Sequence, residues 1–281
     1  MHAERCRHCS AVCNLCEGTG KLHYQNEQAL WFSRSCSCQE TDRKIALLRL
    51  LKLPGKFFDA DFDNFNRKLP NQTDVSKFES ALDKGKQFTD TVAREYAEKK
   101  SGFGIKGLLF HGSPGSGKTR LMAVILKELI LQSSLTVRFT EFSSLISEIK
   151  KGYDNGESQS NLIDPLIEAD ILGIDELAKG RRSDWYLGIT DEIITGRYNA
   201  GKITLFTTNY NPGEAKPYAR SEVKEDDIEL YTLQERLNPR IFSRLMEMTE
   251  FVDMNFFDYR QLEHAHNLQS TRTPGVNVIR N

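Results

Sequence analysis

The chain has 281 residues, a formal net charge of −1 at pH 7, 39% hydrophobic residues and 27% charged residues. These values are ordinary for a soluble globular protein, and the length allows one large domain plus a small module. The near-neutral charge excludes a globally basic nucleic-acid binder, so any nucleic-acid surface must be a local patch. No apolar run approaches membrane-spanning length and the polar start is not a secretory signal, so we expect a cytoplasmic protein without a membrane partner.

All six cysteines lie near the start of the chain, and two pairs of them have spacings typical of metal ligands. The pairs are Cys13 with Cys16 and Cys36 with Cys38. Turn residues and strand-like stretches between the pairs predict a β-hairpin that presents two thiolates at each end. Four thiolates form a closed tetrahedral set for Zn²⁺, whereas a disulfide framework suits a small secreted domain. We therefore predict a structural zinc site.

A further pair, Cys6 and Cys9, precedes this set. Three interpretations stay open: alternative ligands for the same ion, half of a second site with His2 or His8, or free thiols. A redox role is disfavoured, because no thioredoxin-like βαβ pattern surrounds the pair. The number of zinc ions is therefore left open.

The segment after the cysteines predicts a basic, amphipathic helix at residues 40–53, ended by Pro54 and Gly55. An aromatic stretch follows at Phe57–Phe65, and we expect it to pack on the core, with contact to an adenine ring as the alternative. Residues 75–99 predict a second helix with one apolar face. The apolar positions of that helix are Phe78, Leu82, Phe88, Val92 and Tyr96.

A glycine-rich segment comes directly after the apolar run Leu108–Phe110 and before a helical pattern. It consists of Gly112, Ser113, Pro114, Gly115, Ser116, Gly117, Lys118 and Thr119, which match G-x-x-x-x-G-K-[ST] at every fixed position. Its glycines allow backbone N–H groups to converge on phosphate oxygens at a helix N-terminus. Lys118 is expected to reach the β- and γ-phosphates, and the Thr119 hydroxyl to ligate Mg²⁺. The segment therefore predicts a site for ATP and Mg²⁺.

Apolar, β-rich runs separated by helical patterns predict a parallel five-stranded sheet. The runs are 108–110, 135–139, 171–174, 203–206 and 251–254. Ligands gather at the carboxyl ends of such strands. Asp175 and Glu176 follow the third run, so we expect Asp175 to hold Mg²⁺ and Glu176 to act as general base toward the attacking water. Asn209 follows the fourth run and is expected to orient that water or contact the γ-phosphate, with an Asx turn as the alternative.

Three arginines near the end of the chain are further candidates. Arg240 and Arg244 lie one turn apart on a helix that Pro239 is suited to begin. They are either ordinary surface charge or groups that enter the nucleotide site of a neighbouring chain, where arginine stabilises the transition state. Arg260 lies just past the last strand, where it could contact the nucleotide of its own chain.

Motifs along most of the chain support a family resemblance. They are CNLCEGTGKL, RSCSC, GLLFHGSPGSGKTRL, ADILGIDEL followed by SDW, LFTTNY, and TLQERLNPRIFSRLMEMTEFVDMNFFDYR. With them the sequence resembles the DnaC/DnaI/IstB group of AAA+ ATPases, in particular helicase loaders with an N-terminal zinc module. The resemblance implies an α/β fold of the P-loop AAA+ (ASCE) type, with helices flanking the sheet and no separate lid. We expect a zinc module with a linker helix at residues 1–53, an ATPase domain at 54–265 and a polar tail at 266–281.

The resemblance also implies roles for the strand-end and helix residues. Asn209 takes the sensor-1 role, Arg244 that of the arginine finger with Arg240 as a supporting or alternative arginine, and Arg260 the sensor-2 role. The segment at residues 142–154 would face single-stranded DNA. Its residues suited to that contact are Lys150, Lys151 and Tyr153, which combine positive charge with an aromatic ring.

The implied function is ATP-dependent loading of a replicative helicase hexamer onto single-stranded DNA. The zinc module would dock onto the helicase, and the ATPase domains would associate head-to-tail into a ring or spiral. A transposition helper of the IstB kind is one alternative, which the zinc module disfavours. A scaffold that does not hydrolyse ATP is disfavoured by Asp175 and Glu176. A nucleic-acid-binding ribbon at residues 6–38 is disfavoured by its small basic excess.

Overall fold

A parallel sheet of five strands forms the centre of the computed structural model, which describes residues 13–17, 19–66, 71–98, 104–133, 135–213 and 232–259. The strands are β3 (Gly107–His111), β4 (Val137–Glu141), β5 (Ile171–Asp175), β6 (Ile203–Thr208) and β7 (Thr249–Asp253). They lie in the order β4-β5-β6-β3-β7, and every pairing between them is parallel. The predicted five-stranded parallel sheet is therefore confirmed.

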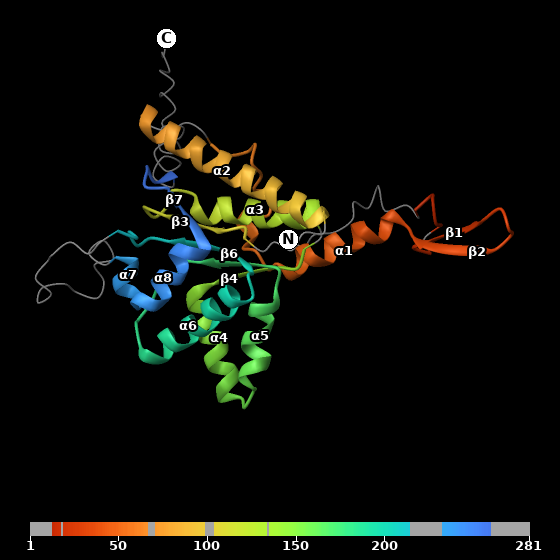
Figure 1. Ribbon diagram of the computed structural model, residues 1–281. Helices are drawn as coiled ribbons and strands as arrows, with labels where there is room; N and C mark the ends of the chain where they lie inside the picture. The colour runs from red at the N-terminus through yellow and green to blue at the C-terminus, as the bar shows by residue number, and fades with distance from the viewer. Residues whose placement is uncertain are drawn as a thin grey trace, which may run out of the picture.

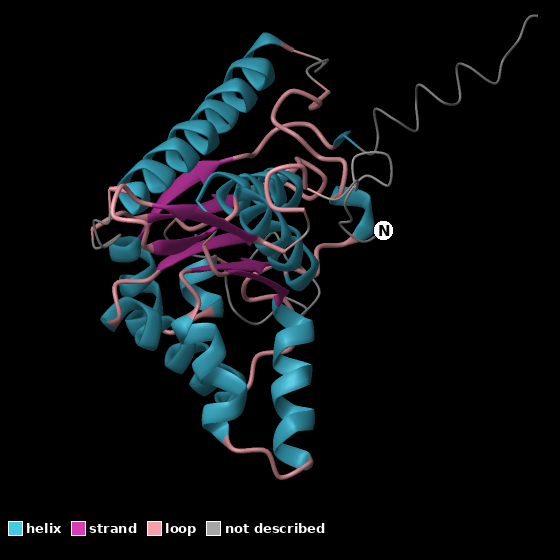
Figure 2. Ribbon diagram, turned by 90° about the vertical axis from the view of Figure 1, so that its right-hand side faces the viewer, coloured by secondary structure: helices cyan, strands magenta, loops and turns pink. Residues whose placement is uncertain are grey.

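Helices cover both faces of the sheet, so the molecule has three layers (Figures 1 and 2). One core is built by α2 (Gln72–Ala97) and α3 (Lys118–Ser133), joined by the end of α1 (Ser37–Leu50). The other core contains α4 (Phe142–Asp154), α5 (Gln159–Glu168), α6 (Asp184–Asn199), α7 (Leu233–Arg236) and α8 (Pro239–Met248). Strands that are covered on both faces have continuous runs of apolar residues, and this is why they could be predicted from the sequence.

The predicted apolar face of the long helix is found on α2. Phe78, Leu82, Phe88 and Val92 are buried, and Tyr96 is partly buried against the same core. The aromatic stretch before α2 packs in the expected way, since Phe65 is buried in this core and its ring lies 5.7 Å from that of Phe78.

A hairpin of β1 (Lys21–Gln25) and β2 (Trp31–Ser35) precedes the sheet and stands at the far end of α1, away from the strands (Figure 1). The helix after it starts at Ser37, earlier than expected, because Cys36 has the extended backbone of an N-cap residue. Cys38 therefore belongs to the first turn of α1. A short 3₁₀ turn, η1 (Gly55–Phe57), follows Pro54 where the predicted helix was expected to have ended.

The edge strand β4 is displaced by two residues from its predicted run. Just before the strand, the Thr136 amide and hydroxyl both donate to the Asp170 carboxylate, at 3.0 and 2.6 Å. The strand continues to Glu141, which lies level with Asp175 of β5. The carboxyl edge of the sheet therefore carries one more polar side chain, that of Glu141, which the sequence had not indicated.

Among the described residues no helix is long and apolar enough to cross a membrane. The expected absence of a lid, the tail at residues 266–281, Arg260, and the pair Cys6 and Cys9 all fall outside the described ranges.

Candidate ATPase site

The glycine-rich segment forms a tight loop between β3 and α3. Gly112, Gly115 and Gly117 have φ angles of 136°, 78° and 92°, which side chains disfavour. A Cβ at Gly112 would lie 2.5 Å from the Asn255 amide nitrogen, and one at Gly115 would lie 1.8 Å from an Asp258 carboxylate oxygen. Backbone conformation therefore favours glycine at all three positions, as the motif predicted, and lack of space adds to this at Gly112 and Gly115.

Lys118 begins α3 and is buried. Its ammonium group donates to the carbonyls of Gly112 at 2.8 Å and Ser113 at 2.7 Å, so the side chain folds back along its own loop. The charge therefore lies beside the backbone that would receive phosphate oxygens. A strand, a glycine loop and a helix N-terminus with this lysine fit the phosphates of a nucleotide.

The two residues predicted to hold Mg²⁺ are in contact. The Thr119 hydroxyl donates to a carboxylate oxygen of Asp175 at 2.8 Å. Asp175 is only 7% exposed, and burial raises its pKa while hydrogen bonds from Thr207 and Thr119 oppose that rise. A hydroxyl and a carboxylate at the edge of a phosphate loop are a donor set that fits Mg²⁺.

Glu176 follows Asp175 in a left-handed backbone conformation, with φ of 55°. Its amide donates to the Thr207 hydroxyl at 2.9 Å, and its carboxylate forms an ion pair with Lys179. Hydrogen bonding to Glu176 raises the pKa of Lys179. The Glu176 side chain is partly exposed at the carboxyl edge of the sheet, where a general base is expected. Thr207 holds its backbone and Lys179 its carboxylate.

Thr207, which the sequence reading passed over, connects these acids. Its hydroxyl lies 2.5 Å from Asp175 and also accepts from the Glu176 amide, and the residue is buried. Asn209 lies two residues further on, partly buried, immediately beyond the end of β6. The only signal in the sequence was the run of two threonines before Asn209, which is equally typical of a β-strand.

Glu141 is the second polar group that sequence reasoning missed. It caps α4 by accepting from the amides of Ser143 and Ser144, at 3.2 and 2.9 Å. Burial pushes the pKa of Glu141 upward, but the hydrogen bonds from Ser144 and Ser143 outweigh it, so the pKa is lowered. A carboxylate therefore stays ionised beside Asp175.

The chain that follows β7 lies against the phosphate loop. The Tyr259 amide donates to the Gly115 carbonyl at 3.2 Å, and the Ser113 hydroxyl donates to the Asn255 side chain. Arg260 is the next residue and lies outside the described residues, so its sensor-2 role stays a prediction.

Arg240 and Arg244 share one partner within the protomer. Arg244 donates to Asp191 on α6 at 3.3 Å, and Arg240 lies 3.7 Å from the other oxygen of the same carboxylate. The Arg240 side chain is 64% exposed, whereas that of Arg244 is 20% exposed. The two arginines thus do occupy one helix face, while the identity of the arginine finger stays a prediction.

The four predicted zinc ligands come together. Their sulfurs all lie within 4.8 Å of one another, with Cys13 to Cys36 at 3.7 Å and Cys16 to Cys38 at 3.5 Å. A tetrahedral zinc site with Zn–S bonds of about 2.3 Å spaces its sulfurs at about 3.8 Å. Contact with Cys16, followed by loss of hydration, raises the pKa of the Cys38 thiol to about 12, and a bound cation would relieve that crowding. The cluster therefore fits zinc.

The candidate DNA-contacting residues lie at the end of α4. Lys150 and Lys151 are exposed, and Tyr153 is partly buried with its ring edge-on to that of Trp185, 6.4 Å between centroids. Trp185 lies in the first turn of α6 and is 39% exposed. The tryptophan was visible in the SDW motif, but its pairing with Tyr153 joins residues far apart in the chain.

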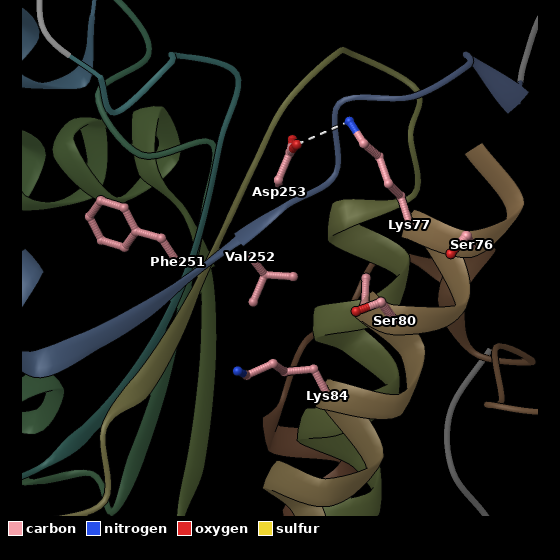
Figure 3. A pocket seen from close by; sticks show the side chains of 8 residues that line it. Ser76, Lys77, Ser80, Lys84, Phe251, Val252 and Asp253 are labelled. Atoms are coloured by element: carbon pink, nitrogen blue, oxygen red, sulfur yellow. Dashed lines mark hydrogen bonds and ion pairs between the residues drawn. The ribbon is translucent and has the colours of Figure 1, made fainter. Parts of the chain in front are cut away.

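A separate hollow of about 410 Å³ lies between α2 and the edge strand β7. Figure 3 shows Lys77 reaching across it to Asp253, at 3.3 Å, with Ser76, Ser80 and Lys84 along the helix side. None of its lining residues belongs to the phosphate loop or to the acidic pair. It is therefore not part of the candidate ATPase site.

The fold and the site together define a class. A parallel sheet in the order β4-β5-β6-β3-β7, with a phosphate loop after β3 and an acidic pair after β5, is the arrangement of a P-loop AAA+ protein. A scan against protein-family models found no match.

Individual relatives narrow the class. The chain is 28% identical over 201 residues to the replicative helicase loader DnaC of Escherichia coli K12, covering 70% of this chain and 75% of that protein. The crystal structure of the DnaC helicase loader superposes with a TM-score of 0.52 at 27% identity, covering 71% of this chain and 99% of the other. This protein is thus homologous to the DnaC helicase loader and has a DnaC/DnaI-type AAA+ fold.

Two further solved structures share the fold. The crystal structure of DnaI gives a TM-score of 0.51 at 21% identity, covering 74% of this chain and 94% of the other. The structure of DnaA from Aquifex aeolicus bound to AMPPCP gives a TM-score of 0.51 at 12% identity, covering 80% of this chain and 58% of the other. At these identities the two structures show the fold alone.

Proposed function

We propose that this protein is an ATP-dependent loader that places a replicative helicase hexamer on single-stranded DNA. The observation that carries the proposal is its homology to the DnaC helicase loader over 201 residues, together with a phosphate loop and acidic pair in contact.

In the proposed reaction ATP is the substrate. Lys118 would leave the loop carbonyls to pair with phosphate oxygens, and Thr119 with Asp175 would hold Mg²⁺, which neutralises phosphate charge when bound. Glu176 would accept a proton from the attacking water, and Asn209 would orient that water. The ion pair between Glu176 and Lys179 must open or swing aside for this step, since a carboxylate engaged by an ammonium group is a poorer base.

Assembly would complete the site. Arg244, supported by Arg240, would stabilise the transferred phosphoryl group in the neighbouring protomer. Head-to-tail contacts of this kind generate a ring or an open spiral. Arg240 is already exposed, and Asp191 holds both side chains on one face before a neighbour arrives.

Two surfaces would serve the partners. Lys150, Lys151 and the Tyr153–Trp185 pair offer charge for the DNA backbone and rings on which bases stack. The zinc hairpin exposes a set of large apolar side chains, as expected of a protein-docking surface. They are Leu15, Tyr24, Leu30, Trp31 and Phe32, with Trp31 71% exposed.

Co-purification with the replicative helicase of the same organism tests the proposal. The full-length protein with ATP is expected to form a stable complex that a Trp31→Ala/Leu30→Ala double variant weakens and that a Lys77→Ala variant does not. If the protein ignores the helicase and coats duplex DNA in the presence of ATP, the loader function is wrong and a transposition helper replaces it.

A further inference from the structure

Arg236, at the end of the short helix α7, binds the loop that follows the acidic pair. Its guanidinium donates to the Ala178 carbonyl through two nitrogens, at 3.0 and 3.3 Å, and to the Gly180 carbonyl. The guanidinium also lies 5.2 Å from the ring centroid of Tyr210, just beyond Asn209. One side chain thus touches both segments that carry candidate catalytic residues.

The loop held by Arg236 has an unusual backbone. Glu176 and Ala178 both have positive φ, 55° and 69°, a conformation that non-glycine residues adopt only where the surroundings impose it. Leu177 lies between them, buried, with its amide donating to the Thr207 carbonyl at 2.7 Å. Arg236 supplies the matching restraint on the far side of the loop. The direction of the Glu176 side chain therefore depends on a backbone that β6 holds on one side and Arg236 on the other.

The helix that carries Arg236 is itself fixed to the same region. Thr232 caps α7 in a reciprocal capping box with Glu235, and the Leu233 amide donates to the Asn211 carbonyl at 2.8 Å. Arg182, beyond the loop, donates to the Glu235 carbonyl at 3.0 Å. Hydrogen bonds therefore connect α7 and this part of the chain in both directions, since Arg236 donates to the loop and Arg182 donates to α7.

Helix α7 lies directly before α8 in the chain. Leu237 and Asn238 alone separate α7 from α8, and Asn238 caps α8 by accepting from the Ile241 amide at 2.8 Å. A displacement of α8, which carries Arg240 and Arg244, would reach Arg236 through this short connection, and through Arg236 the loop behind Glu176.

We infer that Arg236 is a positioning residue for ATP hydrolysis, which holds Glu176 in its working orientation through the carbonyls of Ala178 and Gly180. The inference rests on the proposed ATPase function and assigns Arg236 no contact with ATP itself. It makes α7 the mechanical connection between the arginine-bearing helix and the general base.

The test compares Arg236→Ala, Arg236→Lys and wild type in the full-length protein, with Arg138→Ala, an exposed arginine on β4, as control. ATP hydrolysis, ATP binding by calorimetry with magnesium, and hydrogen–deuterium exchange of the 176–180 segment are measured. We expect Arg236→Ala to lower kcat about tenfold or more while the Kd for ATP stays within about twofold. Exchange at residues 176–180 should rise, and exchange in the phosphate loop should not.

Lysine keeps the charge but lacks the planar fork that reaches two carbonyls, so Arg236→Lys should restore only part of kcat. If Arg236→Ala fails to fold, the kcat of Arg236→Lys and its hydrogen exchange at residues 176–180 test the inference instead. Wild-type kcat in Arg236→Ala, unchanged protection of residues 176–180, or parallel loss of kcat and ATP affinity would each overturn the inference. If wild type hydrolyses no ATP, the proposed function fails, while the exchange data still decide whether Arg236 fixes the loop.

Discussion

The hydroxyl of Thr119 donates to Asp175 at 2.8 Å, which joins the first turn of α3 to the end of β5. The two residues are 56 positions apart in the chain, and they meet because parallel strands bring their carboxyl ends to one edge. The contact makes the phosphate loop and the acidic pair a single site.

Replacing Thr119 by alanine removes one of the two groups expected to hold Mg²⁺. We predict that the Mg²⁺ concentration for half-maximal ATP binding rises on the order of tenfold, the equivalent of about 1.4 kcal/mol. Thr119→Ser keeps the hydroxyl and should bind like wild type. A magnesium titration at fixed ATP checks this, and equal midpoints for alanine and wild type would contradict it.

Thr207→Val tests the connection between the two acids. Burial raises the pKa of Asp175, and the Thr207 hydrogen bond opposes that rise by favouring the carboxylate. Without it the pKa of Asp175 should rise further, so Asp175 takes up its proton at a higher pH. Because Mg²⁺ requires the carboxylate, magnesium-dependent ATP binding should be lost at a higher pH on the acid side. Binding profiles between pH 4 and 8 measure this, with Thr207→Ser as the control that keeps wild-type behaviour.

The structure also shows which contacts a sequence can and cannot indicate. The phosphate loop was predictable because its chemistry depends on neighbours in the chain, with glycines where φ is positive and a lysine at the helix start. Thr207, Asp191 and Arg236 act on residues 32, 53 and 58 positions away, and no local pattern marks such pairs. In the sequence, Asp191 is indistinguishable from other charged residues on a helix. Its contact with Arg240 and Arg244 arises only because α8 packs beside α6.

The same reasoning applies to the strand boundaries. Thr136 lies within the predicted β-run, yet its amide and hydroxyl bond to Asp170 and the strand begins at the next residue, Val137. At its other end β4 pairs with β5 as far as Glu141, which lies level with Asp175. A boundary two residues later than predicted therefore adds an acidic residue to the carboxyl edge of the sheet.

Cys16→Ser should abolish zinc binding, because Cys16 is buried in the cluster and its sulfur also accepts from the Gly20 amide at 3.3 Å. Metal analysis of the purified protein should find one zinc per wild-type chain and much less in the variant. Cys9→Ser should retain the metal if the four-cysteine set is complete, and loss of zinc there would show that Cys9 is a ligand. The sheet should keep its melting temperature, since the hairpin lies away from it.

Arg197 should matter for stability rather than for catalysis. Its side chain is fully buried and donates to the carbonyls of Leu166, Ala169 and Ile203 at 2.6, 2.9 and 2.5 Å, which connects α6 to the end of α5 and to β6. Arg197→Met would leave these carbonyls without donors and should lower the free energy of unfolding by about 3 kcal/mol or more. Urea unfolding followed by circular dichroism measures the loss. A variant as stable as wild type would contradict the role assigned to these hydrogen bonds.

Mixing two inactive variants tests whether Arg244 acts on a neighbour. Lys118→Ala should not hydrolyse ATP because its own phosphate loop lacks the ammonium group, and Arg244→Ala should not because it supplies no arginine. In a mixed assembly an Arg244→Ala protomer still has Lys118 and Glu176, and a Lys118→Ala neighbour still has Arg244. One kind of junction is then complete, so an equimolar mixture should recover roughly a quarter of wild-type activity if protomers mix at random. Steady-state hydrolysis above the assembly concentration measures the recovery, with each variant alone as the control. A mixture as inactive as its components would mean that Arg244 serves its own chain, where Asp191 holds it.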